Sequence, residues 1–434
     1  MAATWREVAG VGCQRAVTVV KFEHVPTTLS PIVLALVAAV PWWIAPALVS
    51  LRLRTTPSLD DIDATPPKVQ DAERVSVILP ARNEASHIGA CVRSVLSSTW
   101  PNLELIVVDD HSSDGTSNLA RDAAGGDVRM TLVSAPDLAA GWFGKQWACQ
   151  SGAAHATGSL LLFIDADTRH SPDLVGRLVR ARAERGAELM SVAGRQEMLT
   201  LWERAVQPCV FVLILLRYGG ADSMERASNA SDVVANGQCF MLSRAVYDAI
   251  GGHNAVRDFV AEDVMMAQTV WKSGKRVSLV RGLNQLSTRM YNGLGELVKG
   301  WGKNVYAGGR FAMRGGAVGR AIYPLLLLSF PLGMVCPFAL LLTLAIANVA
   351  LGSTPLSVDA PVGGALFGTT LLWWSAATSL GVLATFGVAN KLNRDPVWRA
   401  LLAPLGGAVL LYICIVAIAR GRNVSWKGRG YQAR

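Results

Sequence analysis

The stretch Ser159-Leu-Leu-Leu-Phe-Ile-Asp-Ala-Asp167 decides the fold class, because an uninterrupted apolar run ends directly in two carboxylates. Two similar runs occur earlier in the chain, Val75-Ser-Val-Ile-Leu-Pro80 and Leu103-Glu-Leu-Ile-Val-Val108. Helical stretches alternate with these runs, and they are expected over residues 83–96 and 146–155. Buried strands that alternate with helices are typical of a mostly parallel sheet covered on both faces. The sequence therefore predicts an α/β domain.

Polar side chains follow each of the three predicted strands at the point where the strand ends. These clusters are Arg82-Asn83-Glu84, Asp109-Asp110 and Asp165-Ala166-Asp167. In sheets of this kind, ligands bind beyond the carboxyl ends of the strands. Polar clusters at three strand ends therefore indicate one shared binding site.

A second acidic cluster, Glu262-Asp263, follows a Gly-rich stretch much later in the chain. Carboxylates gathered behind apolar segments are costly unless a cation binds among them, and a hard divalent ion that carries a diphosphate is the usual solution. In an extended segment, one of Asp165 and Asp167 can hold a ribose or a metal-bound water while the other ligates the ion. We therefore predict Mg²⁺ or Mn²⁺ at Asp165 and Asp167. The alternative is a helix N-cap pair, since Ser171 and a proline follow closely.

Two loops carry further polar groups. The segment 109–116, Asp-Asp-His-Ser-Ser-Asp-Gly-Thr, has the beginning of a calcium loop, but the position that requires a bidentate glutamate is Arg121. Its carboxylates suit hydrogen bonds from a base and a ribose instead. In the second loop, Gly141-Trp-Phe-Gly-Lys145, the glycines permit close approach of a ligand, and Lys145 at a helix start can neutralise a phosphate.

Long apolar segments predict a membrane protein. Of the 434 residues 51% are hydrophobic and only 17% are charged, whereas a soluble protein would have about 25% charged residues. Four segments contain no charged residue: Val25–Leu51, Ala321–Val358, Ala360–Asn390 and Ala400–Ala419. Each exceeds or reaches the roughly 20 apolar residues that cross a bilayer. The alternative, four buried core helices of a soluble protein, fits this length and number poorly.

These segments divide the chain into six parts. The expected parts are a leader over 1–28, a transmembrane anchor over 29–51, a catalytic domain over 70–288, an interfacial basic region over 289–320, a C-terminal transmembrane region over 321–419 and a basic tail over 420–434. Residues 55–68 are rich in Pro, Thr and Asp and are expected to form a linker. The leader and the length of the first apolar run favour an uncleaved anchor over a signal peptide.

Basic residues predict the orientation in the membrane. They dominate 289–320, next to a span, which favours the anionic cytoplasmic leaflet. With a cytoplasmic catalytic domain, the loop 351–361 falls outside and the basic loop 391–399 inside, as the positive-inside rule requires. A fourth span would then place the basic tail outside, so either Ala400–Ala419 does not fully cross or the rule fails there. Ala205–Leu216 is apolar but too short to span, and an interfacial or re-entrant helix and plain core remain alternatives.

Several classes of function are disfavoured. The net charge of +9 is diffuse and has no accompanying pattern of stacking aromatic residues, so we expect no nucleic-acid partner. The seven cysteines are scattered, which disfavours a zinc site and a disulfide framework and fits a reducing, cytosol-facing domain. A transporter is disfavoured because no ionisable residue interrupts the four apolar segments. The sequence carries no indication of the oligomeric state.

The motifs VILPARNE, VVDDHSSDGT, GWFGKQWA, FIDADT, NGQCF and AEDV occur in this order between Val75 and Ala307. In this order the chain resembles family 2 glycosyltransferases of the GT-A fold. It is most similar to the membrane-bound branch that glycosylates carotenoids, with the hopanoid-associated glycosyltransferases as near relatives. The resemblance implies a mostly parallel GT-A sheet domain with one N-terminal and about three C-terminal transmembrane helices.

The resemblance also implies roles for individual residues. Asp263 is the expected catalytic base, and Asp165 and Asp167 are the expected metal ligands. The expected donor-binding residues are Pro80, Arg82, Asn83, Glu84, Asp109, Asp110, Lys145 and Asp165. The expected acceptor-binding residues are Gly237, Gln238, Glu262 and Trp301.

The implied reaction is the metal-dependent, inverting transfer of a single sugar from a nucleotide-sugar of the UDP-glucose type to a hydroxyl of a membrane lipid, a carotenoid or another isoprenoid. The expected location is the cytoplasmic face of the cell (inner) membrane, in a multi-pass protein. Processive polysaccharide synthases of the family carry a Gln-x-x-Arg-Trp motif, and the matching region, 289–304, lacks the Arg-Trp pair. Polysaccharide synthesis, a hopanoid-pathway glycosyltransferase and an inactive nucleotide-sugar-binding membrane protein remain the alternatives.

Overall fold

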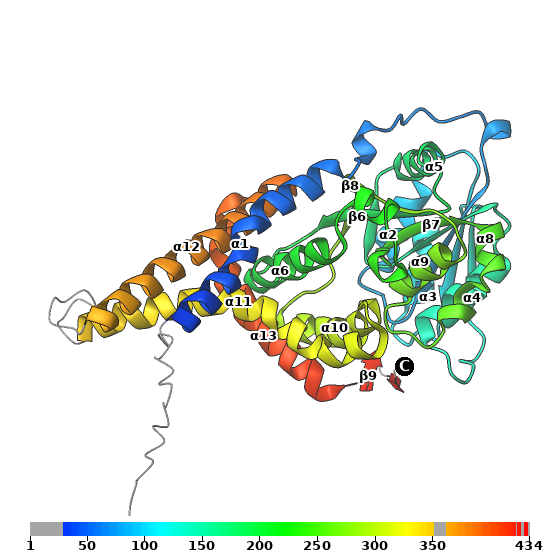
Figure 1. Cartoon of the computed structure of the whole chain (residues 1–434). Helices are drawn as coiled ribbons and strands as arrows, with labels where there is room; N and C mark the ends of the chain where they lie inside the picture. Colours follow the sequence, from blue (N-terminus) through cyan, green and yellow to red (C-terminus); the bar gives the residue numbers. More distant parts are fainter. Residues whose placement is uncertain (1–28, 351–361, 422, 427–428, 433–434) are drawn as a thin grey trace, which may run out of the picture.

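The structure is a computed structural model that describes residues 29–350, 362–421, 423–426 and 429–432 (Figure 1). The predicted leader over 1–28, the outer loop over 351–361 and parts of the basic tail lie outside the described residues. A globular α/β domain forms one end of the molecule, and long helices project from it toward the other end.

The α/β domain contains an eight-stranded sheet in the order β3-β2-β1-β4-β7-β6-β8-β5. Its strands are β1 (Val75–Ala81), β2 (Leu103–Asp109), β3 (Met130–Ser134), β4 (Leu160–Ile164), β5 (Thr168–His170), β6 (Leu189–Gln196), β7 (Cys239–Ser243) and β8 (Val277–Thr288). Strand β1 pairs in parallel with both β2 and β4, and β6 pairs in parallel with β8. Only β7 and β5 run antiparallel to their neighbours. The predicted mostly parallel α/β sheet is confirmed.

Helices cover both faces of this sheet, as the apolar strands require. They are α2 (Ile88–Leu96), α3 (Thr116–Ala124), α4 (Gly144–His155), α5 (Leu174–Glu184), α8 (Arg244–Ala249) and α9 (Glu262–Lys272). Alternate residues of β1 enter different cores: Val77 and Leu79 pack in the core that contains α2 and α5, and Ile78 packs in the core that contains α4 and α9. This alternation follows from the two-residue period of a strand.

The helix predicted from Asn83 begins at Ile88, so the start of this prediction is wrong. Asn83 lies in the left-handed region with φ of 53°. The backbone N–H groups of residues 83 and 84 donate to the side chains of Ser112, at 3.0 Å, and Thr116, at 2.8 Å. These side chains of the β2–α3 loop hold the segment after β1 in a turn and prevent an earlier helix start.

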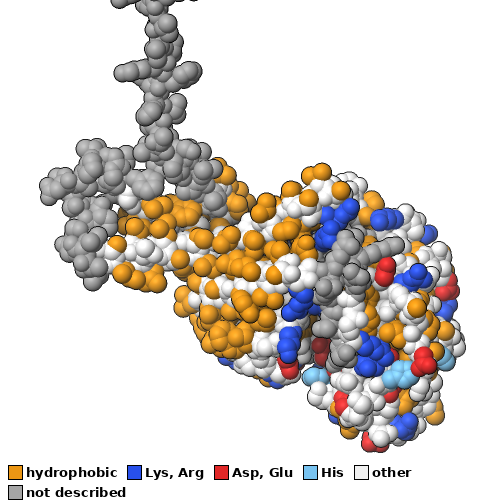
Figure 2. All heavy atoms as spheres, turned by 90° about the horizontal axis from the view of Figure 1, so that it is seen from below, with side chains coloured by type: hydrophobic (Ala, Val, Ile, Leu, Met, Phe, Trp, Pro, Cys, Tyr) orange, Lys and Arg blue, Asp and Glu red, His pale blue; other side chains and the backbone are white. Residues whose placement is uncertain are grey.

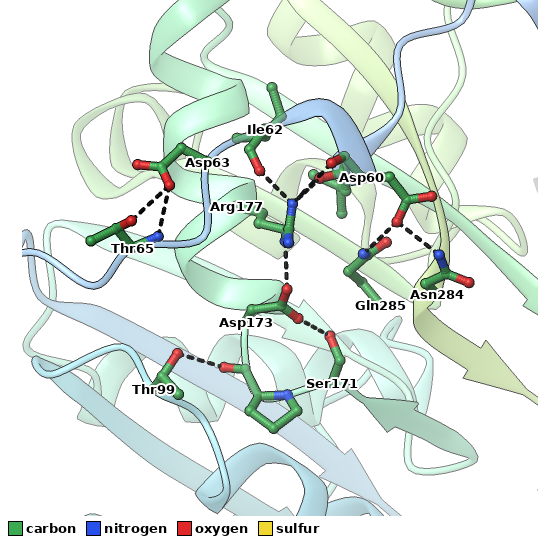
Figure 3. Close-up of polar contacts among 12 residues, drawn as sticks. Asp60, Ile62, Asp63, Thr65, Thr99, Ser171, Asp173, Arg177, Asn284 and Gln285 are labelled. Atoms are coloured by element: carbon green, nitrogen blue, oxygen red, sulfur yellow. Dashed lines mark hydrogen bonds and ion pairs between the residues drawn. The ribbon is translucent and has the colours of Figure 1, made fainter.

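The predicted linker is docked onto the α/β domain (Figure 3). Arg177 of α5 donates to the carbonyl oxygens of Leu59, at 2.8 Å, and Ile62. The carboxylate of Asp60 accepts from Asn284 and Gln285 of β8 at 2.9 and 2.8 Å. A segment whose carbonyl and carboxylate groups are bonded in this way has a fixed course across the domain.

The projecting part contains the long apolar helices. They are α1 (Leu29–Thr55), α6 (Leu201–Tyr218), α10 (Leu294–Ala307), α11 (Gly316–Ala350), α12 (Val362–Leu392) and α13 (Ala403–Arg420), with the short α7 (Ala221–Glu225) after α6. Among the described residues, four segments are long and apolar enough to cross a membrane: Leu201–Glu225, Gly316–Ala347, Thr370–Leu392 and Val397–Arg420. Hydrophobic side chains cover this part, whereas charged side chains gather over the α/β domain (Figure 2).

The apolar stretch Ala205–Leu216 is part of a longer helix than the sequence predicts. Helix α6 has 18 residues, because Thr200 and Glu203 form a capping box before the apolar run and Pro208 does not end the helix. With α7 it reaches the length of a span, so the prediction that it is too short is wrong by this criterion. More than half of this window is buried inside the protein, at 56%, since α6 packs against α13, α1 and α12.

Helix α13 returns to the α/β domain. Its N-terminal end follows the end of α12, where Arg394 pairs with Asp60 at 3.2 Å and Arg281 donates to the Leu392 carbonyl at 2.7 Å. Its C-terminal end leads into an antiparallel hairpin of β9 (Asn423–Trp426) and β10 (Arg429–Gln432). This hairpin contacts the α/β domain, since Arg429 pairs with Asp110 at 2.7 Å. The segment before α13 and the hairpin after it therefore both contact the α/β domain.

Candidate active site

A cavity of about 1010 Å³ lies between the strand ends of the α/β domain and the apolar helices. Twelve of the residues that the sequence predicts for the site line it: Pro80, Arg82, Asn83, Glu84, Lys145, Asp165, Asp167, Gly237, Gln238, Glu262, Asp263 and Trp301. Asp109 and Asp110 do not line it. The structure thus brings together residues at the ends of β1 and β4, residues before β7, and residues of α4, α9 and α10.

Lys145 joins the two acidic clusters. Its Nζ lies 2.7 Å from Asp165 Oδ1 and 2.7 Å from Glu262 Oε1. Burial opposes the charge on Lys145, but the two carboxylates outweigh burial and raise its pKa well above the usual value. Burial also opposes the charge on Glu262, and Lys145 outweighs it and lowers the pKa of that carboxyl. Lys145 at the start of α4 is therefore a cation at the centre of the site.

Asp263 is held in one orientation by the backbone. Its Oδ2 accepts from the Gly237 N–H at 2.7 Å, and its Oδ1 accepts from the Val264 N–H at 2.8 Å. A Cβ at residue 237 would lie 2.8 Å from Asp263 Oδ2, so only glycine permits this approach. Burial, and then the charge of Glu262, raise the pKa of Asp263 to about 6. A carboxylate with this pKa can accept a proton near neutral pH.

Asp167 lacks a partner for one of its oxygens. Its Oδ1 is buried and forms no hydrogen bond. Burial, and then the charges of Asp165 and Glu84, raise the pKa of Asp167 to about 7. A buried carboxylate oxygen without a donor is what a bound cation would satisfy.

The residues present fit a hard divalent cation only with ligands from outside the protein. Among the described parts of the chain there is no group of three or more His, Cys, Asp or Glu side chains with the geometry of a metal site. Asp165 is already paired with Lys145, which leaves Asp167 as the main protein ligand. Mg²⁺ is commonly bound by one or two carboxylates together with substrate phosphates and waters. Asp165 and Asp167 would therefore hold such an ion together with a phosphate-bearing ligand.

Hydrogen bonds to the carboxylate of Asp109 shape the loop after β2. Asp109 accepts from the Ser112 N–H at 3.1 Å and from the Ser117 hydroxyl at 2.5 Å, so both of its oxygens serve the loop. Asp110 is only 1% exposed, and Arg82 and Arg429 both approach its Oδ2, at 3.8 and 2.7 Å. The structure therefore gives Asp109 a role in shaping the loop and places Asp110 beneath two arginines.

The residues predicted for the acceptor line the same cavity as the acidic clusters. Gln238 Oε1 accepts from the side-chain amides of Gln196 and Asn236, at 3.0 and 3.2 Å. Trp301 of α10 is buried edge-on against Phe211 of α6, with ring centroids 5.9 Å apart. Its indole Nε1 is buried without a hydrogen-bond partner, so a ligand oxygen in the cavity could accept from it.

Sequence reasoning missed Lys303, which also lines the cavity. In the sequence it was only one of the basic residues of 289–320. In the structure, α10 places its side chain near the two acidic clusters. Burial lowers its pKa, and the charges of Glu262, Asp165 and Asp263 oppose that decrease. A spacing of two residues places Trp301 and Lys303 on different faces of one helix, so nothing in the sequence indicated that both would line the cavity. Arg429 and Tyr431 of the C-terminal hairpin were missed as well.

Comparisons with known proteins found a matching family model and similar curated proteins. Residues 76–251 match the family model described as Glycosyl transferase family 2. A 4,4'-diaponeurosporenoate glycosyltransferase of Staphylococcus haemolyticus is 25% identical over 245 residues, or 55% of this chain and 63% of the relative. The protein of the same name from Staphylococcus aureus strain MRSA252 is 27% identical over 239 residues, or 54% of this chain and 61% of the relative. The chain thus spans about three fifths of the length of these curated relatives.

A solved structure shares the fold over nearly the whole chain. It is described as a mannosyltransferase from Pyrobaculum calidifontis in complex with GDP-Man and Mn²⁺. The match covers 90% of this chain and 98% of the other, with a TM-score of 0.52 and 22% sequence identity. Residues 76–251 are therefore similar to the glycosyltransferase family 2 model, and the chain shares the fold of this solved structure, a mostly parallel sheet domain with apolar helices.

Proposed function

We propose that the protein transfers one sugar from a nucleotide-sugar donor to an oxygen of a membrane lipid with a long apolar chain, a carotenoid or another isoprenoid. The observation that carries the proposal is the continuity of the cavity. One end presents the carboxylates and Lys145 of the α/β domain together with Lys303 of α10, and the other end is lined by apolar side chains of α6, α10 and α11. A nucleotide diphosphate fits the first end, and an apolar chain fits the second.

The apolar end of the cavity has a wall that can hold a hydrocarbon chain. Its wall includes Phe211 and Ile214 of α6, Met290, and Tyr323 and Leu327 of α11. These side chains belong to or pack against the core shared by the projecting helices, so the cavity extends into the part of the protein whose surface is mostly hydrophobic (Figure 2). The curated relatives are named for glycosyl transfer to 4,4'-diaponeurosporenoate, a carotenoid, which supports an acceptor of this class.

The polar end supports an in-line transfer with one base. Asp263 takes the proton from the acceptor hydroxyl as its oxygen forms a bond to the anomeric carbon, and the bond from that carbon to the diphosphate breaks. The backbone N–H groups of residues 237 and 264 keep the carboxylate of Asp263 oriented during this step. Lys145 and Lys303 place positive charge beside the departing diphosphate. A single base without a nucleophilic carboxylate implies inversion, and a divalent ion at Asp165 and Asp167 would stabilise the leaving charge.

The helices suggest how the protein sits in the membrane. We assign three crossing helices, α1, α11 and α12, which project together from the α/β domain (Figure 1). Segments of α11 and α12 are among the four candidate spans, whereas α1 is not, and its assignment rests on its packing against α12 and on the charge-free segment Val25–Leu51. Helix α13 returns to that domain at both ends, which favours the alternative that Ala400–Ala419 does not fully cross. Basic residues then lie at the ends of the crossing helices on the side of the α/β domain: Arg52 and Arg54 in the last turn of α1, Arg314 before α11, and Arg394 after α12. By the positive-inside rule this side is cytoplasmic.

The rate of transfer is expected to depend on pH through Asp263. The base must be deprotonated, so kcat/KM should increase roughly tenfold per pH unit below the pKa of about 6 and level off above it. Glu262, Lys145 and Lys303 also face this carboxyl, and removing a cation should raise its pKa. The Lys303→Met variant is therefore expected to shift the acid limb of the profile to higher pH. A profile that stays flat through this range would exclude Asp263 as the titrating base.

A charge in the apolar end of the cavity should impair acceptor binding. We expect Ile214→Glu to raise the KM for the lipid acceptor about tenfold or more, because an apolar chain cannot stabilise a buried carboxylate. Binding of the nucleotide should not change. Leu201→Glu is the matched control, since Leu201 lies at the exposed start of the same helix and is 49% exposed. Equal effects of the two variants on the acceptor KM would contradict the assignment of this cavity to the acceptor.

The function itself can be tested in membranes that contain the protein. Membranes are incubated with radiolabelled UDP-glucose or GDP-mannose, and the lipid fraction is extracted and analysed by mass spectrometry. We expect label in an isoprenoid glycoside. Label in an insoluble polymer would support a polysaccharide synthase instead, and label in a hopanoid would support the related lipid pathway. Nucleotide binding without any turnover would indicate an inactive binding protein.

A further inference from the structure

The segment between β8 and α10 is held in place at both ends. Arg289 pairs at 3.2 Å with Glu203, a fully buried residue in the first turn of α6. Asn292 donates to Glu296 in the first turn of α10, through its backbone N–H at 2.9 Å and through its side-chain amide at 3.3 Å. Tyr291 lies between these two contacts, so its backbone has a fixed position.

The ring of Tyr291 packs against the helix that follows it. A Cβ at residue 300 would lie 2.5 Å from the hydroxyl oxygen of Tyr291, so Gly300 leaves the space that the phenol occupies. The ring of Trp301 meets the ring of Tyr291 edge-on, with centroids 6.1 Å apart. All three residues line the cavity. The phenol is therefore held on the cavity wall by the middle of α10.

The hydroxyl of Tyr291 is available to a ligand in the cavity. The residue is only 8% exposed, yet its hydroxyl forms no hydrogen bond with any part of the chain that the structure describes. Its oxygen is not fully enclosed by protein, in contrast to Nε1 of Trp301. Burial, and then the charge of Asp167, raise the pKa of Tyr291, so the phenol keeps its proton at neutral pH. A buried tyrosine usually has a partner for its hydroxyl, and here only the cavity has room for one.

The surroundings of Tyr291 indicate which part of a ligand would meet it. The charge of Asp167 reaches the phenol, and Asp167 belongs to the end of the cavity that would hold a metal-bound diphosphate. On its other side Trp301 connects the phenol to Phe211 in the apolar wall. The hexose of a nucleotide-sugar is bonded directly to the diphosphate and reacts with the acceptor, so it would lie between these two ends. Its hydroxyls can form hydrogen bonds with a phenol.

We propose that Tyr291 is a sugar-binding residue, whose hydroxyl forms a hydrogen bond with a hydroxyl of the hexose in the bound donor. This inference rests on the proposed use of a nucleotide-sugar. Asp167 and Lys145 would act on the diphosphate, whereas Tyr291 would contact the sugar that is transferred. Hexoses differ in the orientation of their hydroxyls, so a partner with a fixed position would also contribute to the choice of sugar.

The test compares a nucleotide-sugar with the nucleoside diphosphate that remains after transfer. Calorimetry on the full-length protein in detergent, without acceptor, gives the Kd values of UDP-glucose and UDP, and of GDP-mannose and GDP. We expect Tyr291→Phe to raise the Kd of the preferred nucleotide-sugar about threefold to tenfold, the effect of one lost hydrogen bond, and to leave the Kd of the diphosphate unchanged. Tyr306→Phe is the matched control, because Tyr306 lies on α10 and does not line the cavity.

Gly300→Ala tests the same contact from the side of the helix. The added methyl group would displace the phenol without removing its hydroxyl, so this variant should also raise the Kd of the nucleotide-sugar alone. The thermal unfolding midpoint of each variant shows whether the fold is kept.

Three results would overturn the inference. They are an unchanged Kd of the nucleotide-sugar in Tyr291→Phe, an equal increase in the Kd of the diphosphate, and an effect confined to the KM of the lipid acceptor. The last result would assign the hydroxyl to the acceptor instead. If the unaltered protein binds neither nucleotide-sugar nor either diphosphate, the proposed function fails, and this outcome is distinct from failure of the role of Tyr291.

Discussion

Replacing Asp263 with Asn is expected to reduce sugar transfer by about 10²–10⁴-fold, the usual contribution of a positioned general base. The amide keeps the shape of the carboxylate, and its oxygen can still accept from the Gly237 or Val264 N–H. It cannot take up a proton, so the loss should appear in kcat, whereas the Kd of the donor nucleotide should change little. Single-turnover transfer and nucleotide calorimetry on the same preparation measure the two quantities.

Two controls sharpen this prediction. Asp248→Asn makes the same chemical change at an exposed position of α8, and it should leave transfer unaffected. The pH profile of the residual activity of Asp263→Asn should lose the acid limb near pH 6, because the group that titrates there is gone. Near-normal transfer by the Asn variant would eliminate Asp263 as the base and direct attention to Glu262.

Replacing Asp167 with Ala is expected to remove the dependence of donor binding on a divalent ion. Its Oδ1 has no partner in the protein, and Asp165 is already paired with Lys145, so Asp167 should be the ligand whose loss matters most. A bound ion supplies several kcal/mol of charge stabilisation, so transfer should decrease by about a hundredfold or more. The measurement is donor binding and turnover against Mg²⁺ and Mn²⁺ concentration.

Asp165→Ala is the variant whose response to the divalent ion should be compared with that of Asp167→Ala. This change should weaken donor binding, since Lys145 loses one of its two carboxylate partners, but some response to the ion should persist. Glu184→Ala, at the end of α5, is the control for loss of a carboxylate away from the cavity. Full activity of the unaltered protein in excess EDTA would refute the metal assignment for both aspartates.

The strands and the clusters at their ends were predictable, because each depends on a short stretch of sequence. The apolar runs that become β1, β2 and β4 have no other stable place than a covered sheet. Parallel strands place their carboxyl ends at one edge, which is why Glu84 and Asp165 were expected to share a site. Lys145 links the second acidic cluster to this site, because it pairs with both Asp165 and Glu262. The Gly-Lys segment at the start of α4 had already predicted a cation at this position.

The features that sequence reasoning missed depend on contacts between distant parts of the chain. Arg429 and Asp110 are 319 residues apart, and no local pattern relates them. Helix α2 begins late because the side chains of Ser112 and Thr116 accept hydrogen bonds from backbone N–H groups of the segment after β1. The length of α6 was underestimated because only the apolar run was counted. The helix begins before that run, after a capping box at Thr200.

The ion pair between Arg394 and Asp60 has a consequence for which lipids can react. Arg394 follows α12, and it also donates to Asn284 of β8 at 2.6 Å, so the end of a membrane helix is fastened to the rigid sheet. With α12 crossing the membrane as proposed, these contacts would hold the carboxylates of the site at a constant distance from the bilayer. An acceptor would then react only if its polar end reached that distance while its chain stayed in the cavity. The protein would therefore select acceptors by the distance between their reactive oxygen and the start of their apolar chain.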